Sequence, residues 1–303
     1  MSLYASMQDL IGETPLVRLA HLGFPESFRI YAKLELYNPS GSVKDRIGKS
    51  MIEDAEARGI LKPGGAIVEA TAGNTGLGIA FAALNRGYRL ICVVPTKFSQ
   101  EKQTLLRALG AEIVNTSREG GMLEAWRRAE EIRAGIPDAV TLEQFKNPAN
   151  PRVHYETTGP EIYRDLKGQV DFFVAGAGSG GTYSGALQYL KEQNANIKGV
   201  LADPVGSTMG GGEHASYDIE GIGNDFIADT MDMSLVDQVI KITDAEAFAQ
   251  VKILAVKEGI FAGSSSGGAL AAVHKLAQSG ASGNIVVIIP DRGDRYFSKN
   301  LFD

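Results

Sequence analysis

The stretch that organises the chain reads Asn38-Pro39-Ser40-Gly41-Ser42-Val43-Lys44-Asp45-Arg46. Pro39 and Gly41 are poor helix formers, and apolar residues then recur at helical spacing, so a helix is predicted to begin near Ser42. Lys44 therefore falls in the first helical turn, where its positive charge opposes the helix dipole. A solvated surface lysine is one interpretation, and a partly neutral amine that can form a Schiff base is the other.

Length and composition describe a globular chain with a sizeable core. It has 303 residues, of which 44% are hydrophobic and 22% charged, and its 36 glycines indicate many tight loops. The formal net charge of −6 argues against nucleic acid and an anionic membrane as main partners, because both favour a basic face. Nowhere do 18 apolar residues run together, and residues 1–7 lack a signal-peptide pattern, so a cytoplasmic protein is expected.

Cysteine and histidine are sparse. The single cysteine, Cys92, lies in an apolar run, so an intrachain disulfide is impossible and a buried structural thiol is expected. The four histidines are scattered, without metal-ligand spacing. The sequence therefore predicts no metal site.

Short β-branched runs alternate with helical patterns through most of the chain, which predicts an α/β fold with parallel sheets. The alternation breaks at 147–151, where two prolines interrupt helix, and resumes with a helix predicted near 152–165. A glycine-rich excursion covers 206–223, and a last helix–strand pair is predicted up to 286–289. The two α/β stretches indicate two lobes, and a site between lobes is a common place for a small-molecule ligand.

Five loops fall at strand ends or helix starts, where an open α/β sheet binds its ligands. The loop Thr71-Ala72-Gly73-Asn74-Thr75-Gly76 opens a helix, so its backbone N–H groups suit an anion such as a substrate carboxylate. Asn74 adds an amide donor for an oxygen nearby. An ordinary helix-capping turn is the alternative interpretation.

The loop Gly176-Ala177-Gly178-Ser179-Gly180-Gly181-Thr182 also joins a strand to a helix. Its small residues let the backbone wrap a phosphate, with the hydroxyls of Ser179 and Thr182 as further donors. The same loop fits G-x-G-x-x-G, and Asp203 ends the next strand, where a dinucleotide-binding fold places its ribose acid. A nicotinamide-dependent oxidoreductase is therefore a competing hypothesis.

Three further loops are weaker signals. Residues 263–268 include three serines that can hydrogen-bond a ring nitrogen, the glycine-rich 220–223 can fold over a ligand, and 144–147 supplies an amide that can face a carboxylate. Taken alone, each of these loops is more typical of a cap or a plain turn.

Taken together, these stretches resemble the cysteine synthase and cystathionine β-synthase family, which are pyridoxal-phosphate enzymes of fold type II. The resemblance runs from Ile11-Gly12-Glu13-Thr14-Pro15-Leu16 to Pro290-Asp291. The motif around Lys44 and the run Gly73-Asn74-Thr75-Gly76 are close to a signature of the family.

The resemblance implies a two-lobe fold with pyridoxal phosphate between the lobes. Residues 40–147 are expected to form a smaller substrate-side lobe, and residues 1–39 with 148–303 a larger cofactor-binding lobe. A homodimer is implied as well. A haem-binding extension and a C-terminal regulatory module are not expected.

The resemblance also implies roles for single residues. Lys44 is implied to hold the cofactor as an internal aldimine and then to take the α-proton of the substrate, with Asn74 beside the ring oxygen. Ser265 is implied to face the pyridine nitrogen, and a neutral hydroxyl there makes the ring a milder electron sink, which favours β-elimination and replacement over transamination. The implied phosphate cradle comprises Gly178, Ser179, Gly180, Gly181 and Thr182. The implied substrate site comprises Thr71, Ala72, Gly73, Thr75, Gln144 and Gly221.

The implied reaction is β-replacement on a serine-derived amino acid through an α-aminoacrylate. It is expected to be cysteine synthase-like, converting O-acetylserine and sulfide into cysteine and acetate, or cystathionine β-synthase-like. The chain departs from the family at Ala70 and Ala72, where a proline and a serine are usual, so one donor near the substrate carboxylate is missing.

Asp225 and Asp232 follow the glycine-rich excursion, and both have two interpretations. They are surface or capping residues, or one of them is a base for water or a thiol in a cysteine lyase that releases sulfide. The nicotinamide oxidoreductase and a non-catalytic amino-acid-binding protein are the remaining alternatives.

Overall fold

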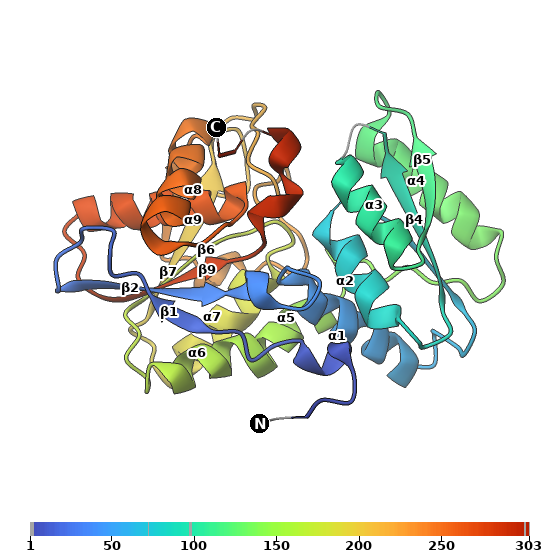
Figure 1. Cartoon of the computed structure of the whole chain (residues 1–303), viewed down its shortest axis with the longest axis horizontal. Helices are drawn as coiled ribbons and strands as arrows, with labels where there is room; N and C mark the ends of the chain where they lie inside the picture. The colour runs from blue at the N-terminus through green and yellow to red at the C-terminus, as the bar shows by residue number, and fades with distance from the viewer. Residues whose placement is uncertain (1–2, 72, 97–98, 300, 303) are drawn as a thin grey trace. The chain divides into compact units, whose positions relative to one another are not determined.

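A computed structural model describes residues 3–71, 73–96, 99–299 and 301–302. The chain divides into two compact units. Unit 1 comprises Met1–Ile11 and Lys44–Ala149, and unit 2 comprises Gly12–Val43 and Asn150–Asp303. Figure 1 shows that each unit has its own sheet flanked by helices.

The sheet of unit 1 is parallel, in the order β3-β4-β5. Its strands are β3 (Ala66–Ala70), β4 (Arg89–Pro95) and β5 (Glu112–Thr116). The helices of the unit are the 3-10 turn η1 (Met7–Leu10), α1 (Lys44–Ala57), α2 (Asn74–Ala83), α3 (Gln100–Ala108) and α4 (Gly121–Ala134). β4 is buried on both faces after its first residue, as expected where helices cover a parallel sheet.

The sheet of unit 2 has the order β1-β2-β9-β6-β7-β8, in which β1 is antiparallel and the other pairs are parallel. Its strands are β1 (Leu16–Arg18), β2 (Phe28–Leu34), β6 (Phe172–Gly176), β7 (Lys198–Pro204), β8 (Gln238–Ile242) and β9 (Gly283–Ile289). The longer helices are α6 (Gly159–Asp165), α7 (Gly181–Gln193), α8 (Asp244–Glu258) and α9 (Ser264–Gln278). Shorter helical turns are η2 (Glu35–Tyr37), α5 (Ala149–Val153), η3 (His154–Thr158), η4 (Met233–Leu235), η5 (Gly293–Arg295) and η6 (Phe297–Lys299).

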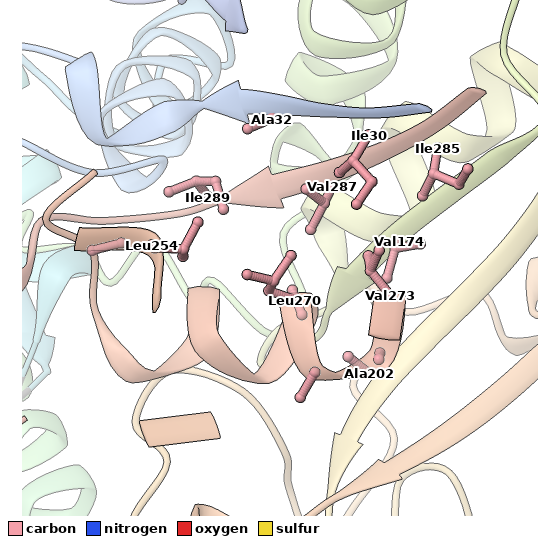
Figure 2. Close-up of a cluster of buried hydrophobic side chains, with 14 of the residues drawn as sticks. Ile30, Ala32, Val174, Ala202, Leu254, Leu270, Val273, Ile285, Val287 and Ile289 are labelled. Atoms are coloured by element: carbon pink, nitrogen blue, oxygen red, sulfur yellow. The ribbon is translucent and has the colours of Figure 1, made fainter. Parts of the chain in front are cut away.

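The core of unit 2 lies on both faces of its sheet. On one face, Ile30 of β2 and Val287 of β9 pack with Leu270 of α9, as Figure 2 shows. On the other face, Phe173 of β6 packs with Tyr183 of α7. Each such buried side chain stabilises the fold by about 1.5–3 kcal/mol, so the strands that carry the candidate loops are firmly held. No helix in the described part of the chain is both long and apolar enough to cross a membrane.

The α/β prediction is confirmed, but the helix that follows the Lys44 motif begins later than predicted. α1 starts at Lys44 rather than near Ser42. The N–H of Val43 donates to the carbonyl of Pro290 at 2.8 Å, and Ser42 forms an antiparallel bridge with Asp291. The backbone before Lys44 is therefore occupied by sheet-like pairing and cannot join the helix.

The helix predicted near 152–165 is present as a continuous helical run over 149–165, but its middle turn is π-helical. The structure has α5, then the π-helical turn η3, then α6. The wider π turn accompanies a buried His154, whose Nδ1 lies 2.8 Å from Thr158 Oγ1 and whose Nε2 lies 3.1 Å from Thr182 Oγ1. The last helix–strand pair is present as α9 and β9, but the prediction lacked β8 and α8, which precede it.

Candidate functional site

Lys44 is the first residue of α1, and it lies in unit 1 with the start of α2. The two helices touch through their backbones, because a Cβ on Gly78 would collide with the carbonyl of Lys44. A Cβ on Gly48 would likewise collide with the backbone of Gly78. Glycines in both helices therefore bring Lys44 close to the helix that begins with Asn74.

The loop between β3 and α2 carries the other candidates of unit 1. Thr71 is 4% exposed, and its Oγ1 accepts the N–H of Gly76 at 3.2 Å. The Oγ1 of Thr75 donates to Oε1 of Gln144 at 2.7 Å, so the structure brings these two predicted residues together. A Cβ on Gly73 would point into open space, so there is room beside this residue at the start of α2, as an anion site needs. Ala72 lies outside the described residues.

Glu69 is a buried acid that sequence reasoning missed. It lies in β3 beside the loop, and its Oε1 accepts the N–H of Leu142 and, at 3.2 Å, that of Glu143. Burial raises the pKa of its carboxyl from 4.5 to about 7 although these two hydrogen bonds oppose the shift. An acid inside an otherwise apolar buried strand was the available signal.

The loop between β6 and α7 carries the predicted phosphate cradle in unit 2. Gly180, the N-cap of α7, has a left-handed φ of +83°, and a Cβ there would overlap Met231. A Cβ on Gly181 would collide with the side chain of Asn150. Both positions therefore require glycine, and the loop presents its backbone at the start of a helix, which is the geometry that binds phosphate.

Hydrogen bonds from three side chains in distant segments of the chain stabilise this loop. Nδ2 of Asn150 donates to Ser179 Oγ at 2.9 Å, and Oγ1 of Thr230 donates to the Ser179 carbonyl at 2.5 Å. Nδ2 of Asn224 donates to the carbonyl of Gly178 at 2.5 Å. Sequence reasoning missed all three, because each ordinary-looking Asn or Thr lies at least 29 positions from its partner.

The glycine-rich 220–223 and the serines of α9 meet the cradle in the same unit. The N–H of Glu220 donates to Ser264 Oγ at 3.0 Å, and the N–H of Gly223 donates to the carbonyl of Ala177 at 2.8 Å. A Cβ on Gly178 would lie 2.7 Å from the carbonyl oxygen of Gly221. Ser265 follows in the first turn of α9 and is 4% exposed.

The residues of unit 2 fit the phosphate and ring of pyridoxal phosphate. A bare helix start, two obligatory glycines and the hydroxyls of Ser179 and Thr182 suit a phosphate, and the buried hydroxyl of Ser265 suits a neutral ring nitrogen. Within the described ranges, no three His, Cys, Asp or Glu side chains gather as ligands for a metal ion.

Three acids singled out from the sequence have internal partners. Oδ2 of Asp203, which was expected to face a ribose in the oxidoreductase hypothesis, lies 2.5 Å from Lys241 Nζ and accepts the N–H of Gly210 at 3.0 Å. Asp225 is exposed, with Oδ1 2.8 Å from Nδ1 of His214. Asp232 is exposed and caps η4 by accepting the N–H of Ser234 at 2.9 Å.

Comparison with known proteins assigns the chain to a family. A family model described as pyridoxal-phosphate dependent enzyme matches residues 7–291. Over 304 residues, the chain is 47% identical to an O-acetylserine dependent cystathionine beta-synthase of Bacillus subtilis (strain 168), covering 100% of this chain and 99% of that relative. It is 48% identical over 304 residues to cysteine synthase A of Escherichia coli (strain K12), covering 96% and 93%.

A solved structure points the same way. A hydrogen sulfide-producing enzyme from Fusobacterium nucleatum matches with a TM-score of 0.94 at 38% identity, covering 98% of this chain and 99% of that one. The fold, the candidate phosphate cradle and the sequence matches agree. The chain belongs to the pyridoxal-phosphate dependent enzyme family.

Proposed function

We propose that this enzyme replaces the β-substituent of a serine-derived amino acid, with O-acetylserine as donor and sulfide or homocysteine as acceptor. The observation that carries the proposal is the near full-length similarity, at 47–48% identity, to one relative named as a cysteine synthase and another named as an O-acetylserine dependent cystathionine beta-synthase. Membership of the pyridoxal-phosphate dependent family argues against the nicotinamide-dependent oxidoreductase. In addition, Asp203, which that hypothesis placed beside a ribose, forms an ion pair with Lys241.

The proposed cofactor residues lie in four segments of the chain. Lys44 would bind the aldehyde carbon of pyridoxal phosphate, and Asn74 its ring oxygen. The phosphate would lie on the loop from Gly178 to Thr182, and Ser265 would hydrogen-bond the ring nitrogen. When bound, the cofactor delocalises the electron pair that stays on the α-carbon after its proton leaves.

The chain's own groups would handle the substrate. The amine of Lys44 would take the proton from the α-carbon, since a lysine at a helix start is placed where its positive charge is disfavoured. The start of α2 and the amide of Gln144 would bind the substrate carboxylate, and Gly221, with its φ of +88°, would let 220–223 fold over the ligand.

A direct assay tests the proposed reaction. Purified enzyme is incubated with O-acetylserine, serine or cysteine as donor, and with sulfide, homocysteine or water as acceptor, while products are quantified. We expect the highest kcat/KM for O-acetylserine with sulfide or homocysteine. Turnover of none of these donors would refute the reaction class, and it would favour an amino-acid-binding protein if the donors still changed the visible spectrum.

Replacing Lys44 tests its catalytic role. We expect Lys44→Ala to abolish turnover and the visible absorbance of the bound cofactor, because the same amine is proposed to bind the cofactor and to take the proton from the α-carbon. Lys49→Ala, five residues further along α1, is the matched control and should keep both. A yellow, active Lys44→Ala enzyme would show that the assignment is wrong.

A sulfide-releasing cysteine lyase is the second candidate function. It is favoured by the similarity to the hydrogen sulfide-producing enzyme from Fusobacterium nucleatum. In it, Asp225 or Asp232 would act as the base for the attacking water or thiol. Asp225→Asn and Asp232→Asn are assayed for sulfide release from cysteine and for cysteine synthesis from O-acetylserine. A selective loss of sulfide release supports this candidate, and equal effects on both reactions remove it.

We propose further that the enzyme is a cytoplasmic homodimer. Val256, Phe261 and Phe297 are 64–82% exposed in unit 2 and line an open groove of about 840 Å³. An exposed apolar face of this kind is typical of an association surface. Light scattering on the protein as it elutes from a size-exclusion column tests the oligomeric state. A mass equal to that of one chain at every protein concentration would contradict the dimer.

A further inference from the structure

Glu69 occupies a place in unit 1 that the proposed mechanism does not use. It pairs in register with Cys92 of β4, and its side chain is directed away from α4, which packs on the opposite face against Ala66 and Val68. The residue is 8% exposed. A buried carboxyl in a strand costs free energy unless hydrogen bonds or an ion pair compensate for its lost hydration.

The carboxyl of Glu69 accepts hydrogen bonds from two neighbouring residues of one turn. Its Oε1 accepts two successive N–H groups, those of Leu142 and Glu143, and the second bond is 3.2 Å long. Glu143 has a left-handed φ of +51°, which is unfavourable for a residue with a side chain. Nδ2 of Asn147 donates to the Leu142 carbonyl at 2.9 Å and closes the turn from the other side. The hydrogen bonds of the carboxyl thus stabilise the first residues of a tight turn in which the backbone of Glu143 is strained.

The next residue of that turn is Gln144, whose Oε1 accepts the hydroxyl of Thr75 at 2.7 Å. We propose that Glu69 is a positioning residue: its buried carboxylate fixes Leu142 and Glu143 so that Gln144 meets Thr75 at the start of α2. The consequence for substrate binding rests on the proposed function, in which Gln144 and Thr75 bind the substrate carboxylate.

The carboxyl of Glu69 is expected to change its charge near neutral pH, where activity can be measured. Burial raises the pKa of its carboxyl to about 7, and the negative charge of Glu143 adds to the shift. Cys92 faces it from β4 as a neutral thiol, because burial raises its pKa to about 12, and α2, described over its whole length, carries no charged side chain. The ionised form is the stronger acceptor for two N–H groups, so the turn should loosen as the pH falls below about 7.

The experiment uses the holoenzyme and compares Glu69→Gln and Glu69→Leu with the wild type. Gln keeps one oxygen acceptor without the charge, and Leu removes the acceptor. Glu143→Gln is the matched control, because it removes an exposed carboxylate from the same turn and leaves the backbone donor in place. Hydrogen exchange of residues 141–147, kcat, KM for O-acetylserine and the visible cofactor spectrum are measured at pH 6 and pH 8.

We expect exchange across 141–147 to accelerate and KM for O-acetylserine to rise about 10-fold at pH 8 in Glu69→Gln, and more in Glu69→Leu, with kcat within about twofold. Glu143→Gln should stay close to the wild type, because the charge of Glu143 is the smallest contribution to the raised pKa of Glu69. In the wild type KM should rise from pH 8 to pH 6, and this rise should be absent in Glu69→Gln.

The outcomes separate the two proposals. Unchanged exchange in Glu69→Gln, which is the variant least disturbing to folding, would overturn the positioning role. A fall in kcat at constant KM would also overturn it, because the carboxyl would then act on the reacting atoms. Faster exchange with unchanged KM would support the positioning role and would instead refute the assignment of Gln144 to the substrate carboxylate.

Discussion

The cradle of unit 2 and the loop 71–76 of unit 1 are both strand-to-helix turns that open a helix, but they are held very differently. Side chains of Asn150, Asn224 and Thr230 all donate into the cradle. The unit 1 loop has the internal bond from the Gly76 N–H to Thr71 and a side-chain bond between Thr75 and Gln144, and Gly73 faces open space.

The difference fits the two ligands proposed for these turns. A resident cofactor phosphate is bound throughout catalysis, so a cradle with satisfied hydrogen bonds and no room for a Cβ is well suited to it. A substrate must enter and leave at each turnover, and the open space beside Gly73 suits that cycle. Substitutions should therefore affect cofactor affinity in the cradle and substrate KM in the loop.

The largest effect is expected in the cradle. Gly180→Ala should lower cofactor affinity by roughly 100-fold, because a left-handed φ and an overlap with Met231 act together. Gly211→Ala is the control, since Gly211 has a similar φ of +84° and a Cβ there would meet open space. Cofactor titration followed by visible absorbance measures both. Equal losses in the two variants would mean that backbone strain alone matters and that the cradle is not sterically closed.

The second effect concerns the support of the unit 1 loop. Glu69 titrates at about 7 in the folded chain and near 4.5 when unfolded, so the folded state binds the extra proton between these values. Stability should therefore fall as the pH rises from 4.5 to 7, by up to roughly 3 kcal/mol. Glu69→Gln should remove this part of the decline.

Thermal melts at pH 5, 6, 7 and 8 measure it, with Glu143→Gln as the control that should melt like the wild type. Parallel curves for the wild type and Glu69→Gln would contradict the raised pKa.

The smallest effect is expected from the side-chain bond in the loop. Thr75→Val removes the donor to Gln144 and should raise the KM for O-acetylserine about fivefold to tenfold, which corresponds to about 1 kcal/mol. Thr75→Ser keeps the hydroxyl and should stay near the wild type. Steady-state kinetics decide, and cofactor affinity should be unchanged in both variants. Weakened cofactor binding in Thr75→Val would contradict the prediction that the loop affects only the KM for the substrate and the cradle only the affinity for the cofactor.

The parts of the site that the sequence predicted are contiguous. The loops 71–76, 176–182 and 263–268 each combine glycines with hydroxyl or amide residues next to a strand or helix, so local chemistry identifies them. The structure brings Thr75 to Gln144, and it brings the cradle to the loop 220–223. The roles of these residues toward cofactor and substrate stay predictions.

The parts that the sequence did not predict depend on long-range packing. Asn150 and Asn224 look like turn residues until the fold places their amides on the cradle. The start of α1 depends on pairing between Val43 and Pro290, which no local pattern shows. Glu69 can be recognised in the sequence as an acid in a buried strand. Its hydrogen-bond partners cannot, because they depend on the fold placing residues 140–143 beside β3.

The most direct test of the cofactor assignment is to locate the lysine that carries it. Purified enzyme is reduced with borohydride, digested with trypsin and analysed by mass spectrometry. Modification of Lys44 blocks cleavage after it, so we expect the cofactor on the missed-cleavage peptide Leu-Glu-Leu-Tyr-Asn-Pro-Ser-Gly-Ser-Val-Lys-Asp-Arg, residues 34–46. The cofactor on any other lysine, or unmodified cleavage after Lys44 in yellow enzyme, would contradict the assignment.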